Sequence, residues 1–262
     1  MLSPSTPAPS INLGYAPAAL NRRAMVYCWL CALSATCLVI ADLVGIRLFR
    51  IPLPFSFSPP WDSQLTINAI EHSCGMFVFP VTFILTDLLN EYYGKRAARR
   101  AVLISFSMGL FVFLVIVSVS ALPRLDAPYN VSEDAYSAVF KNALVMYMAS
   151  LTAYLVGNLA DIAMFTTIKR FTGGKLVWLR ATGSTVISQL LDSFVITYLA
   201  FSLGREMFPN PGAIPMTMHE VYKTALTGYM LKFFIAIAST PIIYAGRSVM
   251  KQVFGLHPLP PE

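Results

Sequence analysis

Hydrophobic residues fall into six long runs, separated by short segments rich in proline, glycine or charged residues. Each run is about 20 residues or longer, which is enough for a helix to cross a hydrocarbon core roughly 30 Å thick. Open strands would leave their backbone groups unsatisfied in lipid, so the runs predict helices rather than sheets. The six predicted spans are residues 25–48, 74–92, 98–122, 142–168, 180–203 and 222–246.

The composition of the 262-residue chain agrees with this pattern, since 56% of its residues are hydrophobic and only 12% are charged. An average soluble domain is roughly 25% charged, so this chain lacks the polar surface that water would require. We therefore predict an all-α integral membrane protein, with six transmembrane helices in a compact bundle over residues 25–248. Residues 1–24, rich in Pro, Ser and Ala, are predicted to be disordered, and residues 249–262 to form a cytoplasmic tail.

Lysine and arginine residues alternate between the segments that join the predicted spans. Twelve of them lie before the first span, in the second and fourth connections and after the sixth span, against six in the other connections. Acidic residues such as Asp126, Glu133 and Glu206 gather in the connections that are poor in basic residues. This bias of positive charge predicts that both termini are cytoplasmic. Because the basic runs are short and follow the topology, we expect no nucleic-acid partner.

Charged residues also occur where lipid would otherwise be expected. Six of them lie within or at the edge of the predicted spans: Asp42, Asp87, Glu91, Asp161, Asp192 and Lys232. Each such charge costs roughly 2.5–3.5 kcal/mol at the bilayer centre on insertion scales, so we expect these side chains to face a polar interior. Lys232 is the only cation predicted to be buried, and we expect it to pair with a carboxylate, for which Asp42 is a candidate.

Helical spacing places the polar residues of several spans on shared faces. Asp87 and Glu91 are four residues apart, and Asn158 lies three residues before Asp161. Gln189 and Asp192 have the same spacing of three in the fifth span. We predict that a substrate site is lined by Asp87, Glu91, Asn158, Asp161, Gln189 and Asp192. The alternative is structural, with buried ion pairs joining helices and Glu91 lying at the cytoplasmic interface beside Lys95.

Motifs for nucleotide or metal-dependent hydrolysis are missing from the sequence, which contains neither G-x-x-x-x-G-K-[ST] nor H-E-x-x-H. Cys28 and Cys31 form a C-x-x-C pair without a nearby histidine, so no metal site is expected. We predict a protein that is not an enzyme and needs no cofactor. Ala149, Ala153 and Gly157 form a stripe of small residues that suits packing within the chain or a homodimer.

The second span and the segment after it read FVFPVTFILTDLLNEYYGKRAARRAV, from Phe77 to Val102. This segment resembles the signature of the YhhQ-type queuosine precursor transporters, once grouped as vitamin uptake proteins. In that family a Phe-Pro precedes a buried Thr-Asp, followed by a Glu-x-Tyr-Gly turn and basic residues. The same order is found here in Phe79-Pro80, Thr86-Asp87, Glu91, Tyr93-Gly94 and Lys95 to Arg100, and Asn158, Asp161, Gln189 and Asp192 continue the match.

The resemblance implies a multi-pass protein of a bacterial inner membrane that imports 7-cyano-7-deazaguanine, its aminomethyl relative, or both. A guanine-like edge presents adjacent N–H donors that one carboxylate can accept, and Gln189 or Asn158 can bind the carbonyl beside them. A second reading is a substrate-binding membrane subunit that docks onto separate ATPase and scaffold subunits, as vitamin-uptake modules do. The sequence leaves the coupling ion open, so buried acids that carry protons and simple facilitated diffusion are both compatible with it.

Overall fold

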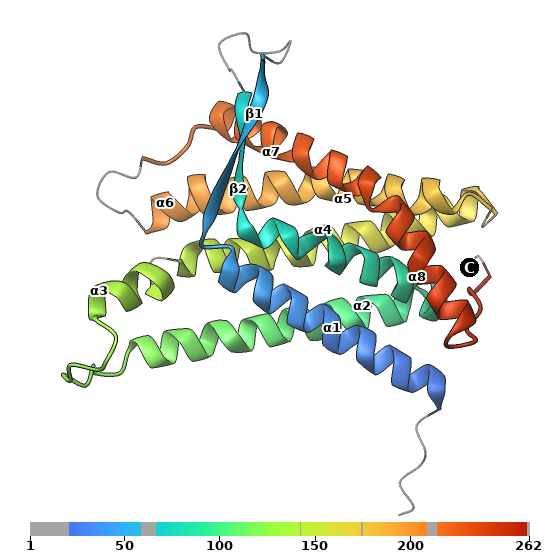
Figure 1. Cartoon of the computed structure of the whole chain (residues 1–262), viewed down its shortest axis with the longest axis horizontal. Coiled ribbons are helices and arrows are strands. Elements are labelled where there is room, and N and C mark those ends of the chain that lie inside the picture. Colours follow the sequence, from blue (N-terminus) through green and yellow to red (C-terminus); the bar gives the residue numbers. More distant parts are fainter. Residues whose placement is uncertain (1–20, 59–66, 142, 174, 209–213, 261–262) are drawn as a thin grey trace, which may run out of the picture.

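The fold is given by a computed structural model, which describes residues 21–58, 67–141, 143–173, 175–208 and 214–260. Most of it consists of the long helices α1 (Arg22–Val44), α2 (Phe79–Ser120), α4 (Leu144–Phe171), α5 (Val177–Thr197) and α7 (Met218–Ala238). Figure 1 shows these helices lying roughly along the long axis of the molecule. Residues 1–20 lie outside the described part, so the predicted disorder of residues 1–24 stays a prediction.

Shorter elements join the long helices. A β-hairpin of β1 (Leu48–Phe57) and β2 (Ile67–Ser73) and the 3-10 turn η1 (Cys74–Phe77) connect α1 to α2. The remaining short elements are α3 (Glu133–Tyr136), η2 (Ser137–Lys141), η3 (Tyr198–Leu203), α6 (Gly204–Met207) and α8 (Thr240–Gln252). Both η2 and η3 are π-helical: η2 directly follows the short helix α3, and η3 directly follows α5.

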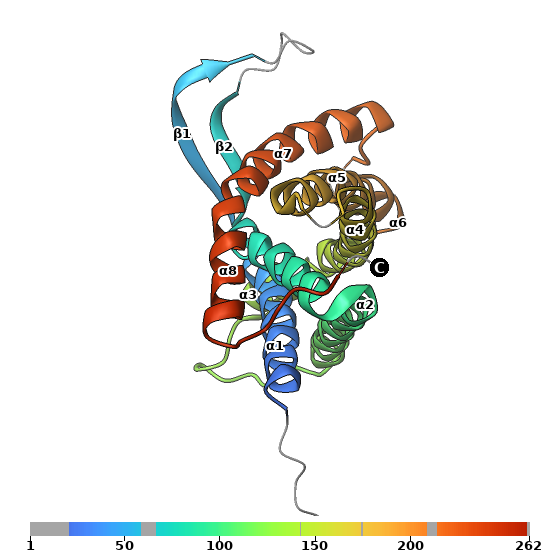
Figure 2. The same ribbon diagram turned by 90° about the vertical axis from the view of Figure 1, so that its right-hand side faces the viewer.

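The β-hairpin corrects the prediction of an all-α fold. Its strands are antiparallel, with Leu48 opposite Ser73 and Pro52 opposite Ala69, and the register is irregular between Pro52 and Phe57. Prolines in this stretch exclude a helix, but a proline is tolerated in an edge strand or beside an irregularity, and both strands of a two-stranded sheet are edges. Figure 2 shows that the hairpin projects from the helical bundle rather than packing within it.

Helix α2 contains a break that turns the chain around. Gly94 has φ 82° and ψ 168°, a conformation that glycine adopts readily and residues with a Cβ rarely do. Figures 1 and 2 show that the two halves of α2, before and after this residue, run in opposite directions. The predicted second and third spans, 74–92 and 98–122, therefore exist as two helical segments, but a single glycine replaces the loop expected between them.

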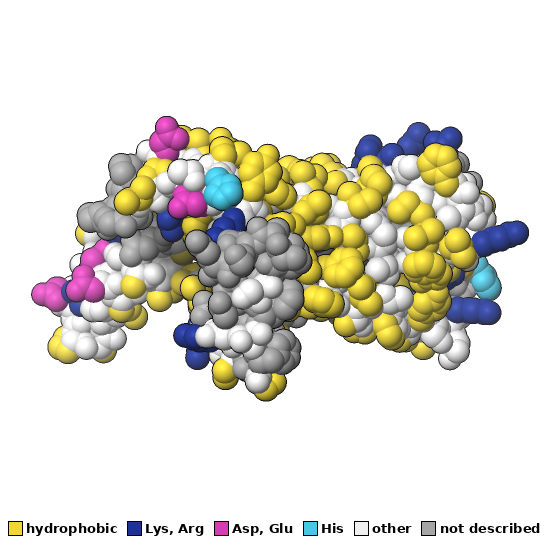
Figure 3. Space-filling model, turned by 90° about the horizontal axis from the view of Figure 1, so that it is seen from above, with side chains coloured by type: hydrophobic (Ala, Val, Ile, Leu, Met, Phe, Trp, Pro, Cys, Tyr) yellow, Lys and Arg dark blue, Asp and Glu magenta, His cyan; other side chains and the backbone are white. Residues whose placement is uncertain are grey.

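The helices are long and apolar enough to cross a membrane. Among the described residues, four helical segments meet this test, and the pair α7 and α8, bent by 40°, makes a fifth when counted as one span. The predicted sixth span, 222–246, corresponds to this bent pair rather than to one straight helix. On the face that Figure 3 shows, hydrophobic side chains cover much of the middle of the molecule, between the two charged ends.

Charged side chains are divided between the two ends of the molecule. Figure 3 shows Asp and Glu gathered at the left-hand end and Lys and Arg concentrated at the right-hand end, with a few basic side chains beside the acidic ones. Exposed basic residues of the right-hand end include Arg96, Arg99 and Arg100 at the turn of α2. The end that carries α3 and α6 is therefore called the acidic end below, and the opposite end the basic end.

Candidate functional site

A cluster of buried polar side chains lies where α2, α4 and α5 meet. All six residues predicted to line a site are buried, and none is more than 3% exposed: Asp87, Glu91, Asn158, Asp161, Gln189 and Asp192. Further polar side chains of the same helices are buried among them: Thr86, Asn90, Ser184, Thr185, Ser188 and Ser193. The spacing of three and four residues along each helix thus does gather these groups between the helices.

Helices α2 and α4 are joined by amide and hydroxyl groups. Thr86 Oγ1 donates a hydrogen bond to Asn158 Oδ1 over 2.9 Å, and Asn90 Nδ2 donates to the Ile162 carbonyl over 3.3 Å. Asn158 Nδ2 also donates to the Tyr154 carbonyl over 2.9 Å. Both ends of the Asn158 amide are therefore engaged within the protein, so in this conformation Asn158 orients α2 against α4.

Asp161 and Gln189 present acceptor atoms that the protein does not satisfy. Asp161 Oδ1 accepts from Ser188 over 3.2 Å and from Thr185 over 3.4 Å, both on α5. In the described part of the chain, Asp161 Oδ2 and Gln189 Oε1 are buried without a hydrogen-bond partner. Asp87 lies near the same carboxyl group. Buried acceptors are rarely left unpaired in native proteins, so these two atoms mark the place where a donor is missing.

Asp192 forms an ion pair with Lys232, and this corrects the predicted pairing of Lys232 with Asp42. Lys232 Nζ lies 2.6 Å from Asp192 Oδ2 and 5.4 Å from the centre of the Phe79 ring. The pair joins α5 to α7, which pack against each other. Gly157 of α4 allows Asp192 to lie close, since a Cβ there would come within 3.3 Å of Asp192 Cβ.

Glu91 lies in a second ion network at the basic end. Glu91 Oε2 is 3.3 Å from Lys169 Nζ, and Glu91 Oε1 is 3.6 Å from an Arg247 guanidinium nitrogen. Lys169 is only 7% exposed, so the prediction that Lys232 is the only buried cation is wrong. The ion-pair partners described for Glu91 are thus Lys169 and Arg247, whereas the structural alternative named Lys95.

The end of the chain covers this network. Leu259 N donates to the Glu91 carbonyl over 2.9 Å, and Lys169 Nζ donates to the Leu259 carbonyl over 2.9 Å. Phe254 and Leu256 pack against an apolar cluster that includes Leu88. Sequence reasoning missed the burial of Lys169 because this residue follows the predicted fourth span and is covered by a segment 90 residues later.

The cluster is closed in this conformation. A cavity between α2, α4, α5 and α8 has a volume of about 10 Å³, room for about one water molecule. Its lining residues are Asp87, Leu88, Glu91, Phe165, Val177, Ala181, Ile243 and Arg247. No purine-sized ligand fits in this cavity. Within the described residues, no group of three His, Cys, Asp or Glu side chains could hold a metal ion.

Comparison with known proteins gives the chain its family. The family model described as "Putative vitamin uptake transporter" matches residues 73–246. This chain belongs to that family. A "Probable queuosine precursor transporter" of Bacillus subtilis is 32% identical over 67% of this chain and 72% of the relative. The "Queuosine precursor transporter" of Escherichia coli is 26% identical over 74% of this chain and 81% of the relative. No solved structure gives a significant match.

The transporter family and the apolar helices identify a multi-pass membrane protein, and the curated relatives are named as transporters. The family match contains every residue of the polar cluster as well as Lys232, whereas α1 with Asp42 lies before it. Substrate contacts of the cluster remain predictions. Sequence reasoning did not single out Ser184 and Thr185, although their spacing of three to four residues from Ser188 places them on the same face of α5.

Proposed function

We propose that this chain imports queuosine precursors, 7-cyano-7-deazaguanine, 7-aminomethyl-7-deazaguanine, or both, across a bacterial inner membrane. The family, and the names of its relatives in Bacillus subtilis, Haemophilus influenzae and Escherichia coli, support a substrate of this class. Two acceptor atoms between α4 and α5, Asp161 Oδ2 and Gln189 Oε1, lack a hydrogen-bond partner among the described residues. This observation supports the proposal, and we propose that the substrate binds at these atoms.

The chemistry of the cluster suits a guanine-like edge. Such an edge presents adjacent N–H donors, and carboxylate and amide oxygens are the acceptors that they need. Phe83 is buried beside the cluster and meets Phe79 edge to face, with 5.2 Å between the ring centres. A flat deazapurine ring can stack on such aromatic surfaces once the helices separate. An aminomethyl ammonium would need a further carboxylate, which Asp87 can supply.

We also propose that the chain crosses the membrane six times. Residues 74–93 and 95–120 count as separate spans because α2 turns back at Gly94, and α7 with α8 forms the last span. An even number of spans leaves both termini on one side, and the basic end then faces the cytoplasm. Reporter fusions test this: a C-terminal phosphatase should be inactive and a C-terminal fluorescent protein bright. An active phosphatase at the C-terminus would reverse the orientation.

Complementation tests the substrate. The chain is expressed alone in a bacterial strain that neither makes deazaguanine precursors nor has its own importer. Nanomolar 7-cyano-7-deazaguanine is then supplied and tRNA is assayed for queuosine. We expect queuosine to return. Its absence despite verified membrane insertion contradicts a self-sufficient importer of this compound. Recovery on adding candidate ATPase and scaffold subunits would instead support the second reading, a substrate-binding subunit.

Variants of the acceptor atoms connect this test to the site. Asp161→Asn should reduce uptake about tenfold or more, because a hydrogen bond involving a charged group contributes roughly 1.5–3 kcal/mol. Gln189→Leu should reduce uptake about two- to tenfold, because a hydrogen bond of a neutral amide contributes roughly 0.5–1.5 kcal/mol. Ser107→Ala is the matched control, since among the described residues this exposed hydroxyl bonds only to the Leu103 carbonyl of its own helix. Wild-type uptake by both site variants, with equal amounts in the membrane, would contradict the assignment of these two atoms.

A further inference from the structure

A second buried carboxyl group lies outside the polar cluster, in the last turn of α1. Asp42 is 9% exposed, and its Oδ1 atom lies 2.5 Å from the Ser150 hydroxyl of α4. Asp42 Oδ2 is buried without a hydrogen-bond partner among the described residues. None of the ion pairs in that part of the chain involves Asp42. Asp42 therefore differs from Asp192 and Glu91, which both have cationic partners.

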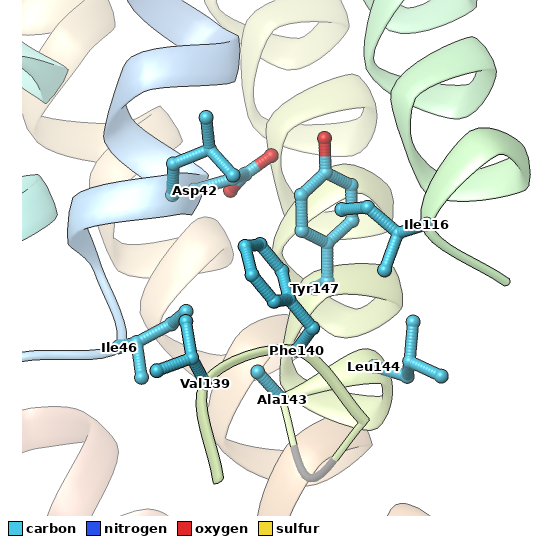
Figure 4. Close-up of a pocket in the computed structure, with 9 residues that line it drawn as sticks. Asp42, Ile46, Ile116, Val139, Phe140, Ala143, Leu144 and Tyr147 are labelled. Carbon is cyan, nitrogen blue, oxygen red and sulfur yellow. The ribbon is translucent and has the colours of Figure 1, made fainter. Parts of the chain in front are cut away.

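The surroundings of Asp42 are apolar. Figure 4 shows the carboxyl group pointing into a small pocket toward Tyr147. This cavity of about 10 Å³ is otherwise lined by Leu43, Ile46, Ile116, Val139, Phe140, Ala143 and Leu144. The Tyr147 hydroxyl donates to the Gly109 carbonyl over 3.2 Å, so its proton is already engaged. A single water molecule is the most that the cavity can add as a partner.

Among the described residues, the elements packed against Asp42 supply no positive charge to this carboxyl. Helix α4 contributes the phenols Tyr147 and Tyr154, and η1 contributes the thiol Cys74. Phenols and thiols are neutral or negative, never cationic. Lys141 of η2 lies 2.5 Å from Glu133 and is paired there. The second half of α2 faces the pocket with the aliphatic Ile116. A proton is therefore the cation that fits this place.

The protonation of Asp42 has a mechanical consequence. An ionised carboxylate buried without a cationic partner costs several kcal/mol, so the closed contact between α1 and α4 favours the neutral acid. The ionised form favours a state in which water reaches Asp42, which requires α1 and α4 to move apart at the acidic end. On α4, Ser150, Asn158 and Asp161 follow at spacings of eight and three residues, which places them on one face. One helix therefore links Asp42 to the polar cluster.

We propose that Asp42 is the binding site of a coupling proton, and that each imported substrate molecule is accompanied by one proton. This inference rests on the proposed function and on the orientation of the acidic end toward the outside. An O–H bond forms at Asp42 Oδ2 by transfer from hydronium of the external medium, and the outer contact of α1 with α4 closes. That bond breaks by transfer to water connected with the cytoplasm, which completes the inward movement of one proton.

Purified full-length chain in proteoliposomes separates this inference from the proposed function. Counterflow of labelled 7-cyano-7-deazaguanine at equal pH on both sides needs no gradient and tests transport alone. Accumulation with an acidic exterior tests coupling, since a gradient of one pH unit can drive about tenfold accumulation for each proton. We expect the wild-type protein to show both activities and a protonophore to abolish only accumulation.

Asp42→Asn keeps the shape of the side chain but replaces the carboxyl group with an amide, which does not take up and release a proton. We expect this variant to retain counterflow and to lose accumulation driven by the pH gradient. Asp126→Asn is the matched control, because the Asp126 side chain is 99% exposed at the same end, and it should behave as wild type. Absence of counterflow in the wild type overturns the proposed function and the coupling with it. The coupling alone is overturned if wild-type protein shows counterflow but its accumulation does not depend on the pH gradient. Normal accumulation by Asp42→Asn also overturns the coupling alone.

Ser150→Ala provides an independent variant in case Asp42→Asn does not insert. Removing the hydroxyl that faces Asp42 changes the stability of the ionised form relative to the neutral form. We expect accumulation to persist while its dependence on external pH shifts. An unchanged pH profile in Ser150→Ala would show that the Asp42 carboxyl does not titrate during transport and would overturn the proposal. A purely structural role for Ser150 would lower the amount of protein but leave this profile unmoved.

Discussion

The buried carboxylates of this protein are of two kinds. Asp192 and Glu91 lie within 4 Å of lysine or arginine nitrogens, so their charges are compensated inside the protein. Asp42 accepts a hydrogen bond from a hydroxyl group, Asp161 accepts from hydroxyl groups and interacts with the Asp87 carboxyl group, and each has one oxygen without a hydrogen-bond partner among the described residues. A compensated pair is complete by itself. An uncompensated carboxyl is complete only when a ligand donor or a proton arrives, so the second kind is where binding is expected.

The two kinds also differ in what they connect. The Lys232–Asp192 pair joins α7 to α5, and the Glu91 network joins α2 to α4, α8 and the end of the chain. These contacts hold the closed cluster together from two sides. Substitutions in them should act first on stability, whereas substitutions of Asp161 and Asp42 should act first on uptake and its coupling.

Breaking a compensated pair should have the largest effect. Lys232→Met leaves Asp192 buried without its cation, and we expect a loss of about 3–5 kcal/mol in stability. The double variant Lys232→Met with Asp192→Asn removes both charges and should recover most of that loss. Thermal unfolding of purified protein in detergent measures both. Exposed Lys251→Met is the control. If Lys232→Met were as stable as wild type, the ion pair of 2.6 Å between Lys232 and Asp192 would contribute nothing to stability.

Adding a side chain at Gly157, beside the paired Asp192 carboxylate, should reduce stability by less than the loss of Lys232. A Cβ at Gly157 would lie 3.3 Å from Asp192 Cβ, so Gly157→Val forces α4 away from α5. Overpacking of this kind costs about 1–3 kcal/mol, and uptake should fall with it because the acceptors of both helices move apart. Gly228→Val is the comparison, since a Cβ there meets open space. Equal stability of the two variants would contradict the close approach of α4 to Asp192.

The sequence predicted which residues are buried better than it predicted their partners. Helical spacing and the cost of intramembrane charge were enough to select Asp87, Asp161 and Asp192, because both effects act within one helix. The partner of Lys232 depends on which helices pack together, and no local pattern carries that information. Gly94 was read as part of a loop, although a glycine that permits positive φ can reverse the chain without one.

Uncovering the second network should have a moderate effect. Deletion of residues 257–262 removes the hydrogen bond from Leu259 N to the Glu91 carbonyl and the one from Lys169 Nζ to the Leu259 carbonyl. Two hydrogen bonds at about 0.5–1.5 kcal/mol each predict a loss of roughly 1–3 kcal/mol. Glu91 keeps Arg247 in this variant, so counterflow should persist. Unchanged thermal stability after the deletion would mean that the tail does not dock on the network.

The smallest effect is expected at an exposed carboxylate with only local partners. Thr217 caps α7, with its side chain accepting from Glu220 N while the Glu220 carboxylate accepts from Thr217 N over 2.8 Å. Thr217→Ala removes the side-chain cap and should cost about 1 kcal/mol in stability. Thr217→Ser keeps the hydroxyl and is the matched control. Neither variant should alter counterflow or its coupling to pH, because this capping box is exposed and far along α7 from Lys232. A change in coupling would mean that surface carboxylates also take part, and the distinction between compensated and uncompensated buried acids would then not explain transport.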